Sequence, residues 1–247
     1  PVEGTGGHGL IANLSAKTEF LKALSYVTED LNYKDIIVEK HFEGIDSRVY
    51  VIEDKVIGAI KRVQPHVVGD GISTIADLIR LREEERSKNP ALHGRKMKID
   101  NEVHHLINQQ GYAMDSIPKK GEKVLLKTKS NVSSGGESID ITDELSDEIK
   151  QIAIDAGKAI PGLVQYGVDL MINFENNTAS VIEINSRPHI TAQLFPEEGK
   201  ARDIPQAIID YYFPETKPNH EKPFYYFDFG HVWDSFQKGN IKQITIP

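Results

Sequence analysis

Two strand-forming segments late in the chain carry oxygen-bearing side chains that could hold a divalent cation. Residues 163–174 and 179–185 are apolar-rich and flank a polar turn, which is the pattern of a β-hairpin. In the register centred on this turn, Asp169 stands opposite Glu183, and Asn185 lies two residues further on the same face. Two carboxylates and an amide oxygen suit Mg²⁺, which takes oxygen ligands and completes its shell with water and phosphates.

The same hairpin could instead be an exposed acidic surface. Asp169 lies within an apolar run, however, and Glu183 is framed by Ile182 and Ile184. Carboxylates in such surroundings are costly without a partner, which favours a bound cation. A one-residue slip in register would separate Asp169 from Glu183 and destroy the site. Arg187 follows Asn185 by two residues and could bind an anion near the metal.

A second hairpin, earlier in the chain, carries two arginines. Residues 49–52 and 56–60 are strand-forming and are joined by a turn at Asp54-Lys55. Arg48 and Arg62 then lie towards the same end of this hairpin and could converge on one anion. Two solvent-exposed arginines on a sheet face are the alternative.

Upstream of that hairpin, an apolar segment runs into a polar linker. We expect Ile36–Val38 to form a strand, and the following residues are polar up to Arg48. A strand end of this kind can present backbone groups to a purine edge, with a carboxylate a few residues on to accept ribose hydroxyls. A plain strand end with surface charges explains the pattern equally well.

Two glycine-rich segments could close over ligands. At the start of the chain, Gly6, Gly7 and Gly9 surround His8, and clustered backbone N–H groups of such a loop can bind phosphate oxygens. The pattern matches neither the P-loop nor the dinucleotide fingerprint, and a flexible turn would also account for it. The second segment, residues 131–136, follows Lys127, so it could cover a substrate whose anionic group the lysine holds. A simple loop is its alternative.

The remaining elements define the scaffold. Helical spacing predicts three helices, beginning near Ser15, Ser73 and Asp143, and a short helical stretch that contains His104 and His105 and ends at Gly111. The charged run over residues 83–90 is expected to be a solvated helix exit. Another strand is predicted at Lys123–Lys127. Hairpins dominate the strand signals and helices are interspersed, so we expect an α+β fold with a largely antiparallel sheet.

Composition excludes several classes of protein. The chain has 247 residues, with 29 Lys and Arg against 37 Asp and Glu, and a net charge of −8. This acidic balance argues against general binding to nucleic acid or to a membrane surface. The absence of cysteine excludes disulfides, thiolate ligands and thiol nucleophiles. No apolar run approaches the ~20 residues of a membrane span, and no signal peptide is visible, so we expect a cytoplasmic protein.

Taken in order, these segments resemble the ATP-grasp superfamily of carboxylate–amine ligases. Within it, the middle of the chain is similar to the cyanophycin synthetases and to the ATP-grasp module of bifunctional glutamate–cysteine ligase/glutathione synthetase. The motifs that carry this resemblance are Val38-Glu39-Lys40-x-x-x-Gly44-x-Asp46-x-Arg48, Arg62-Val63-Gln64-Pro65 with Gly69-Asp70-Gly71, Gln110-Gly111-Tyr112, Asn131-x-Ser133-x-Gly135-Gly136, and Glu183-x-Asn185.

The resemblance implies a role for each candidate residue. Those that would bind the nucleotide triphosphate, adenine and ribose are Gly6, Gly7, His8, Gly9, Glu39, Lys40, Phe42 and Asp46. Those that would bind magnesium are Asp169, Glu183 and Asn185. The arginines near the transferred phosphoryl group would be Arg48, Arg62 and Arg187. The substrate side would comprise Lys127, Asn131, Ser133, Gly135 and Gly136.

The implied activity is ATP-dependent ligation with ATP and Mg²⁺, or Mn²⁺ in its place. A substrate carboxylate would be activated as an acyl phosphate and joined to an amine of an amino acid or peptide. Small-molecule acids and amines are the expected partners, with a homo-oligomer allowed. Two alternatives stay open: a regulatory module that binds ATP without ligation, and a carboxylase-like enzyme that uses bicarbonate, which Arg187-Pro188-His189 favours.

The resemblance covers about residues 1–214 and implies three parts. Residues 1–46 would be the remnant of the first ATP-grasp subdomain, and residues 47–214 the second subdomain with its substrate-loop insertion. Residues 215–247 would be a linker and an aromatic segment of unknown role. Family members usually carry a phosphate-binding lysine immediately before the position of Pro1, so we expect an N-terminal domain in the full-length protein.

Overall fold

The computed structural model describes residues 9, 11, 14–132 and 135–216. The chain divides into two compact units, Pro1–Glu43 and Gly44–Pro247. In the first unit, α1 (Lys17–Ser25) continues into a short π-helical turn, η1 (Tyr26–Asp30). The strand expected at Ile36–Val38 is absent, because a strand needs a hydrogen-bonded neighbour and this segment pairs with none among the described residues. The side chains of Ile37 and Val38 are exposed accordingly.

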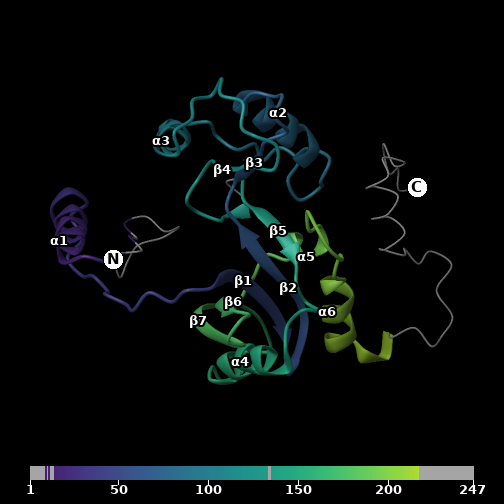
Figure 1. The fold of residues 1–247 in the computed structure, drawn as a ribbon. Helices are drawn as coiled ribbons and strands as arrows, with labels where there is room; N and C mark the ends of the chain where they lie inside the picture. Colours follow the sequence, from purple (N-terminus) through teal and green to yellow (C-terminus); the bar gives the residue numbers. More distant parts are fainter. Residues whose placement is uncertain (1–8, 10, 12–13, 133–134, 217–247) are drawn as a thin grey trace. The chain divides into compact units, whose positions relative to one another are not determined.

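The second unit is built on a five-stranded sheet in the order β5-β2-β1-β6-β7 (Figure 1). Every neighbouring pair is antiparallel. The α+β class with an antiparallel sheet is therefore confirmed. The strands are β1 (Ile45–Ile52), β2 (Lys55–Val63), β5 (Glu137–Asp140), β6 (Gln165–Asn173) and β7 (Thr178–Asn185).

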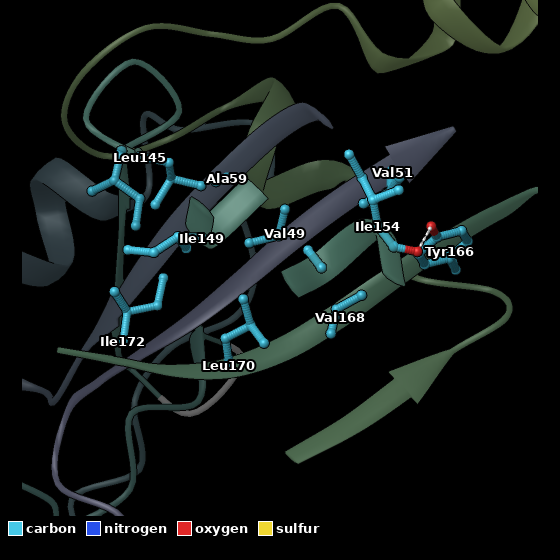
Figure 2. Close-up of a cluster of buried hydrophobic side chains, with 12 residues drawn as sticks. Val49, Val51, Ala59, Leu145, Ile149, Ile154, Tyr166, Val168, Leu170 and Ile172 are labelled. Atoms are coloured by element: carbon cyan, nitrogen blue, oxygen red, sulfur yellow. Dashed lines mark hydrogen bonds between the residues drawn. The ribbon is translucent and has the colours of Figure 1, made fainter. Parts of the chain in front are cut away.

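Alternation along the strands gives the sheet one fully covered face. Val49, Val168 and Leu170 point to this face and pack with Ile149 of α4 (Asp147–Lys158), as Figure 2 shows. All four side chains have 1% exposure or less. This core fixes which side chains of β1 and β6 must point the other way.

The opposite face is covered over part of its length. Tyr50 and Ile52 of β1 point to it and pack against Ile204, the first residue of α6 (Ile204–Tyr212). The short helix α5 (Thr191–Leu194) precedes α6, and the 3₁₀ turn η3 (Pro214–Thr216) follows it. Polar residues occupy the other end of this face, beyond the apolar contacts with α6.

A second layer holds a small sheet and two helices. β3 (His66–Val68) pairs with β4 (Lys123–Leu125), and α2 (Ile75–Arg86) and α3 (Asn101–Gln109) pack with them (Figure 1). The sequence predicted both helices and β4 but not β3, whose three residues are too few for a clear pattern.

Two helices, α2 and α4, begin one and three residues later than predicted, because a better cap is available. The predicted cap of α1, Ser15, is replaced by Ala16, which makes no side-chain cap bond. Thr74 rather than Ser73 caps α2 by accepting from the backbone of Asp77, and Ser146 caps α4 by accepting from Ile149. Serine and threonine are preferred caps because the side-chain oxygen satisfies a free N–H group of the first turn.

The late hairpin, β6 and β7, has the predicted register at the three candidate metal-binding residues. Asp169 pairs with Glu183 and Gly167 pairs with Asn185. A β-bulge follows Asp169, so Leu170 pairs with Val181 and the strands run one residue out of the predicted register from there to the turn. Asp169, Glu183 and Asn185 therefore share a face, as the sequence predicted.

Gly157 offers a test of this core. A Cβ atom there would lie 1.9 Å from Cζ of Tyr166, whose hydroxyl donates to the Ile154 carbonyl at 3.1 Å. Alanine gains about 1 kcal/mol in helix propensity, but overpacking costs about 1–3 kcal/mol and a displaced hydroxyl about 1 kcal/mol more. We expect Gly157→Ala to lower the free energy of unfolding by about 1–3 kcal/mol in urea unfolding. Lys158→Ala, on the exposed side of the same helix, should have little effect, and a stabilised Gly157→Ala protein would contradict this packing.

Candidate functional site

Charged side chains gather at the uncovered end of the sheet face opposite α4. Asp169 lies on β6 directly beside Arg48 of β1, its cross-strand partner. Arg48 Nε donates to Asp169 Oδ1 at 2.6 Å, and Arg48 Nη2 donates to Oδ2 at 2.8 Å. This two-point contact is the strongest geometry for a guanidinium and a carboxylate. Asp169 is only 7% exposed.

Arg62, on the neighbouring strand β2, joins the same group. Its Nη2 lies 2.8 Å from Asp169 Oδ2 and 3.0 Å from Asp46 Oδ1. The Ser130 hydroxyl donates to the other oxygen of Asp46. The two arginines thus converge on one carboxylate, which is one of the two arrangements that the sequence left open, and they compensate the buried charge of Asp169. Arg62 Nε is buried and has no hydrogen-bond partner among the described residues, so this guanidinium retains an unused donor.

Electrostatics keep these groups charged. Burial alone would raise the pKa of Asp169, but the hydrogen bond from Arg48 and the charge of Arg62 outweigh it, so the pKa is lowered. Burial would likewise lower the pKa of Arg48, yet the hydrogen bond and charge of Asp169, with Glu183 and Asp46, raise it. The site is a charged network around one carboxylate.

This network predicts a specific response to acid. Because the pKa of Asp169 is lower in the folded chain than in the unfolded one, the unfolded chain binds more protons near that pKa. The stability that ionised Asp169 contributes is complete above its pKa in the unfolded chain, about 3.9. This stability is lost as the pH falls through the lower pKa of the folded chain. We expect Asp169→Asn to show a shallower loss of stability below about pH 4 in urea unfolding across pH. An unchanged pH dependence would contradict the coupling.

Glu183 and Asn185 extend the network at the sheet edge. Asn185 Nδ2 donates to Glu183 Oε1 at 2.8 Å, and Arg48 Nη2 lies 3.9 Å from the same oxygen. The Glu183 side chain is 58% exposed, so an external ligand can reach it. The contact from Nδ2 leaves the amide oxygen of Asn185 available to a cation.

The donor set fits a hard cation that is shared with a ligand. Among the residues described, no group of three or more His, Cys, Asp or Glu could hold a metal ion by itself. A cation here would have Glu183 and the Asn185 amide oxygen as hard donors that suit Mg²⁺. Both oxygens of Asp169 contact arginines in this structure, so Asp169 would join them only if one of those contacts gave way. The remaining coordination positions would have to come from water and from substrate oxygens, which is the usual way Mg²⁺ is bound.

The residues predicted on the substrate side lie in the second layer. Lys127 is buried, and its ammonium group pairs with Asp100 Oδ2 at 2.8 Å at the N-terminus of α3. Asn131 is exposed, whereas Gly135 and Gly136 are buried. Ser133 lies outside the described residues. Lys127 is therefore already neutralised by a carboxylate of the chain.

Other predicted residues are exposed. Arg187 follows β7 and forms no ion pair with any residue that the structure describes. In the first unit, Glu39, Lys40 and Phe42 are exposed, and Lys40 Nζ lies 5.8 Å from the centre of the Phe42 ring. Gly9 forms a turn with φ 77°. Gly6, Gly7 and His8 lie outside the described residues.

Sequence reasoning missed two arginines of α2. The run over residues 83–90 was expected to be solvated surface, but Arg86 is 4% exposed and pairs with Glu197, and Arg82 pairs with Glu137. The prediction fails because α2 presents one charged face to the rest of the unit. The signal was present in the spacing, since Arg82 and Arg86 are four residues apart and share a helix face.

The architecture and the site together agree with one known domain. Residues 103–191 match the family model of the ATP-grasp domain. The chain also superposes on the crystal structure of a bifunctional glutathione synthetase from Pasteurella multocida with a TM-score of 0.63 and 30% identity, over 82% of this chain and 29% of that chain. The chain thus carries an ATP-grasp domain, and the resemblance seen in the sequence is confirmed.

Two groups of curated relatives lie in the same superfamily. The glutathione biosynthesis bifunctional protein GshAB of Pasteurella multocida is 34% identical over 81% of this chain and 27% of its own length. The cyanophycin synthetase of Synechocystis sp. is 29% identical over 89% of this chain and 26% of its own length. The chain therefore spans about a quarter of the length of these relatives. None of the helices that the structure describes is long and apolar enough to span a membrane.

Proposed function

We propose that this chain is the ATP-binding part of a ligase that activates a substrate carboxylate as an acyl phosphate and joins it to an amine. The observation that carries the proposal is the convergence of Arg48 and Arg62 on Asp169, beside the exposed Glu183 and Asn185. The matches to glutathione and cyanophycin synthetases support it. Phosphoryl transfer between two substrates requires no nucleophile from the chain itself.

Asp169, Glu183 and Asn185 would hold Mg²⁺ with the terminal phosphates of ATP. Bound there, Mg²⁺ would neutralise phosphate charge. Arg48 and Arg62 would orient the phosphates and stabilise the charge that develops in transfer, a role in which preorganised donors are effective.

The reaction would proceed in two transfers between substrates. A carboxylate oxygen attacks the terminal phosphorus of ATP, and the bond to the bridging oxygen breaks to release ADP. The amine then attacks the acyl carbon, phosphate leaves with the electron pair of the broken carbon–oxygen bond, and the amine loses a proton. The chain contributes charge and orientation rather than a covalent intermediate.

The remaining assignments follow the family resemblance and belong to the proposal. Residues Gly6–Gly9 would cover the triphosphate, Glu39, Lys40 and Phe42 would contact adenine, and Asp46 would contact ribose. In the structure Asp46 pairs with Arg62, so its ribose contact would have to coexist with that pair. Arg187 would bind the transferred phosphoryl group or a small anion. We also propose a cytoplasmic location, small-molecule substrates and a homo-oligomeric state.

ADP release by the complete protein tests the proposal. With MgATP, a mixture of amino acids and dipeptides should stimulate ADP release, and omission of Mg²⁺ should abolish it. Stimulation by bicarbonate alone would favour a carboxylase-like enzyme. The exposed Arg187 is the observation that supports this alternative. Binding of MgATP without turnover under any of these conditions would contradict the ligase and favour a regulatory module.

A further inference from the structure

Two arginines of α2 are turned inward although a neighbouring arginine is exposed. Arg82 and Arg86 are four residues apart and share one helix face, with side chains 13% and 4% exposed. Arg80, on another face of the same helix, is 59% exposed and pairs with Glu84. Burial of two guanidinium groups is costly unless their donors are used. The hydrogen bonds of Arg82 and Arg86 therefore show which groups these two side chains hold in place.

Arg86 holds both ends of a short backbone segment. Its Nη1 donates to the Gly136 carbonyl at 3.0 Å, and its Nη2 donates to the Val132 carbonyl at 3.2 Å. Nη1 also contacts Glu197 Oε1 at 2.7 Å, which balances the charge. Burial raises the pKa of Glu197, whereas the charges of Arg86 and Arg82 oppose that rise. One planar cation thus fixes two carbonyls of the chain.

Arg82 holds a third carbonyl, which lies between those of Val132 and Gly136 in the chain. Its Nη2 donates to the Gly135 carbonyl at 2.8 Å and to Glu137 Oε1 at 3.1 Å. Three carbonyls of residues 132–136 are therefore bound by two guanidinium groups from α2. Lysine could not reproduce this arrangement, because an ammonium group lacks the planar fork of donors that arginine presents.

The bound backbone is closely packed. Gly135 has φ 109°, and a Cβ atom there would lie 2.8 Å from Sδ of Met97. A Cβ atom on Gly136 would lie 2.2 Å from the backbone oxygen of Ser130. Small displacements of this segment would therefore move its neighbours.

The segment is linked to the candidate site by hydrogen bonds. Ser130, two residues before Val132, donates its hydroxyl to Asp46, which pairs with Arg62 at 3.0 Å. Arg62 in turn contacts Asp169 at 2.8 Å. The backbone that Arg86 holds is thus connected to the carboxylate at the centre of the charged network.

We infer that Arg86, assisted by Arg82, is a positioning residue that sets Val132, Gly135 and Gly136 in place for the acid or amine substrate. The inference rests on the proposed function, in which this segment lies on the substrate side. Arg86 acts through the carbonyls of Val132 and Gly136 and touches no reacting atom. The carbonyls of Val132, Gly135 and Gly136 are then held before the substrate binds, which lowers the ordering cost of binding.

The test uses the complete protein and the variants Arg86→Lys and Arg82→Lys, with Arg80→Lys as the matched control on the exposed face of α2. The rate of amide hydrogen exchange of residues 130–137 measures how firmly this part of the backbone is held. ADP release gives KM for MgATP and for a mixture of amino acids and dipeptides. We expect Arg86→Lys to speed exchange about tenfold and to raise KM for the mixture about fivefold. KM for MgATP should change less than about twofold, and Arg80→Lys should resemble the wild type.

Each outcome bears on the inference. Unchanged exchange in Arg86→Lys, or faster exchange with unchanged KM for the mixture, would overturn it. An equal rise of both KM values, or the same changes in Arg80→Lys, would indicate a structural role and also overturn it. Should Arg86→Lys fail to fold, Arg82→Lys decides by the same readouts. Absence of stimulated ADP release in the wild-type protein would instead refute the proposed function, whereas exchange would still show whether Arg86 holds the segment.

Discussion

Replacing Asp169 with alanine is expected to lower the free energy of unfolding by about 3–5 kcal/mol, the usual cost of breaking a buried ion pair on one side. Arg48 and Arg62 would lose the carboxylate on which both converge, at contact distances of 2.6 and 2.8 Å. The low exposure of Asp169 prevents water from replacing it fully. Chemical unfolding of the complete protein, followed by circular dichroism, measures the change.

The control for this prediction is another aspartate on an exposed surface. Asp155 of α4 is exposed, and its side chain accepts a hydrogen bond from Gln151 of the same helix at 2.7 Å. Asp155→Ala should change stability by no more than about 0.5 kcal/mol. An Asp169→Ala protein as stable as this control would show that the arginines do not depend on Asp169, and the description of the network would be wrong.

Replacing Glu183 with glutamine is expected to lower ADP release at least ~100-fold while leaving the fold intact, since several kcal/mol of charge stabilisation are at stake. Glutamine keeps the shape of the side chain and the oxygen that accepts from Asn185 at 2.8 Å. It removes the negative charge that a divalent cation requires. Because Glu183 is largely exposed, stability should change by less than about 1 kcal/mol. Turnover with MgATP and the unfolding transition are the two measurements.

Glu175→Gln is the matched control for this change. Glu175 is an exposed residue in the turn of the same hairpin and lies outside the candidate site. Its substitution should leave turnover unchanged. Full activity of Glu183→Gln would remove Glu183 from the metal site, and a comparable loss in both variants would point to damage to the hairpin.

The register of the late hairpin could be predicted because two local signals agreed. Alternation of apolar residues fixed which side of β6 is buried, and the polar turn fixed where the strands reverse. The bulge after Asp169 was not predicted, because a single register counted from the turn allows no extra residue in one strand. It lies between Asp169 and the turn, so it does not disturb the pairing of Asp169 with Glu183.

The partners of Asp169 were harder to predict. The sequence indicated that a buried carboxylate there needs compensation, and a cation was the expected source. Two arginines from β1 and β2 supply much of it, and only the strand order β2-β1-β6 reveals this. Strand order between distant segments depends on tertiary packing, which periodicity does not encode.

The burial of Arg86 escaped prediction for a related reason. A run of alternating charges is usually a solvated surface, and α2 has such a surface at Arg80. The inward face is recognised only when Glu197 and the carbonyls of Val132 and Gly136 are seen beside it. The partners come from residues 46 to 111 positions away in the chain. The expected strand at 36–38 failed similarly, because no neighbour pairs with it in the described unit.

A crystal structure of the complete protein with Mg²⁺ and a non-hydrolysable ATP analogue tests the central claim most directly. We predict Mg²⁺ bound to the terminal phosphates of the analogue and to oxygens of Asp169, Glu183 and Asn185. Phosphates and metal bound away from β6 and β7, with Glu183 and Asn185 left free, would contradict the account.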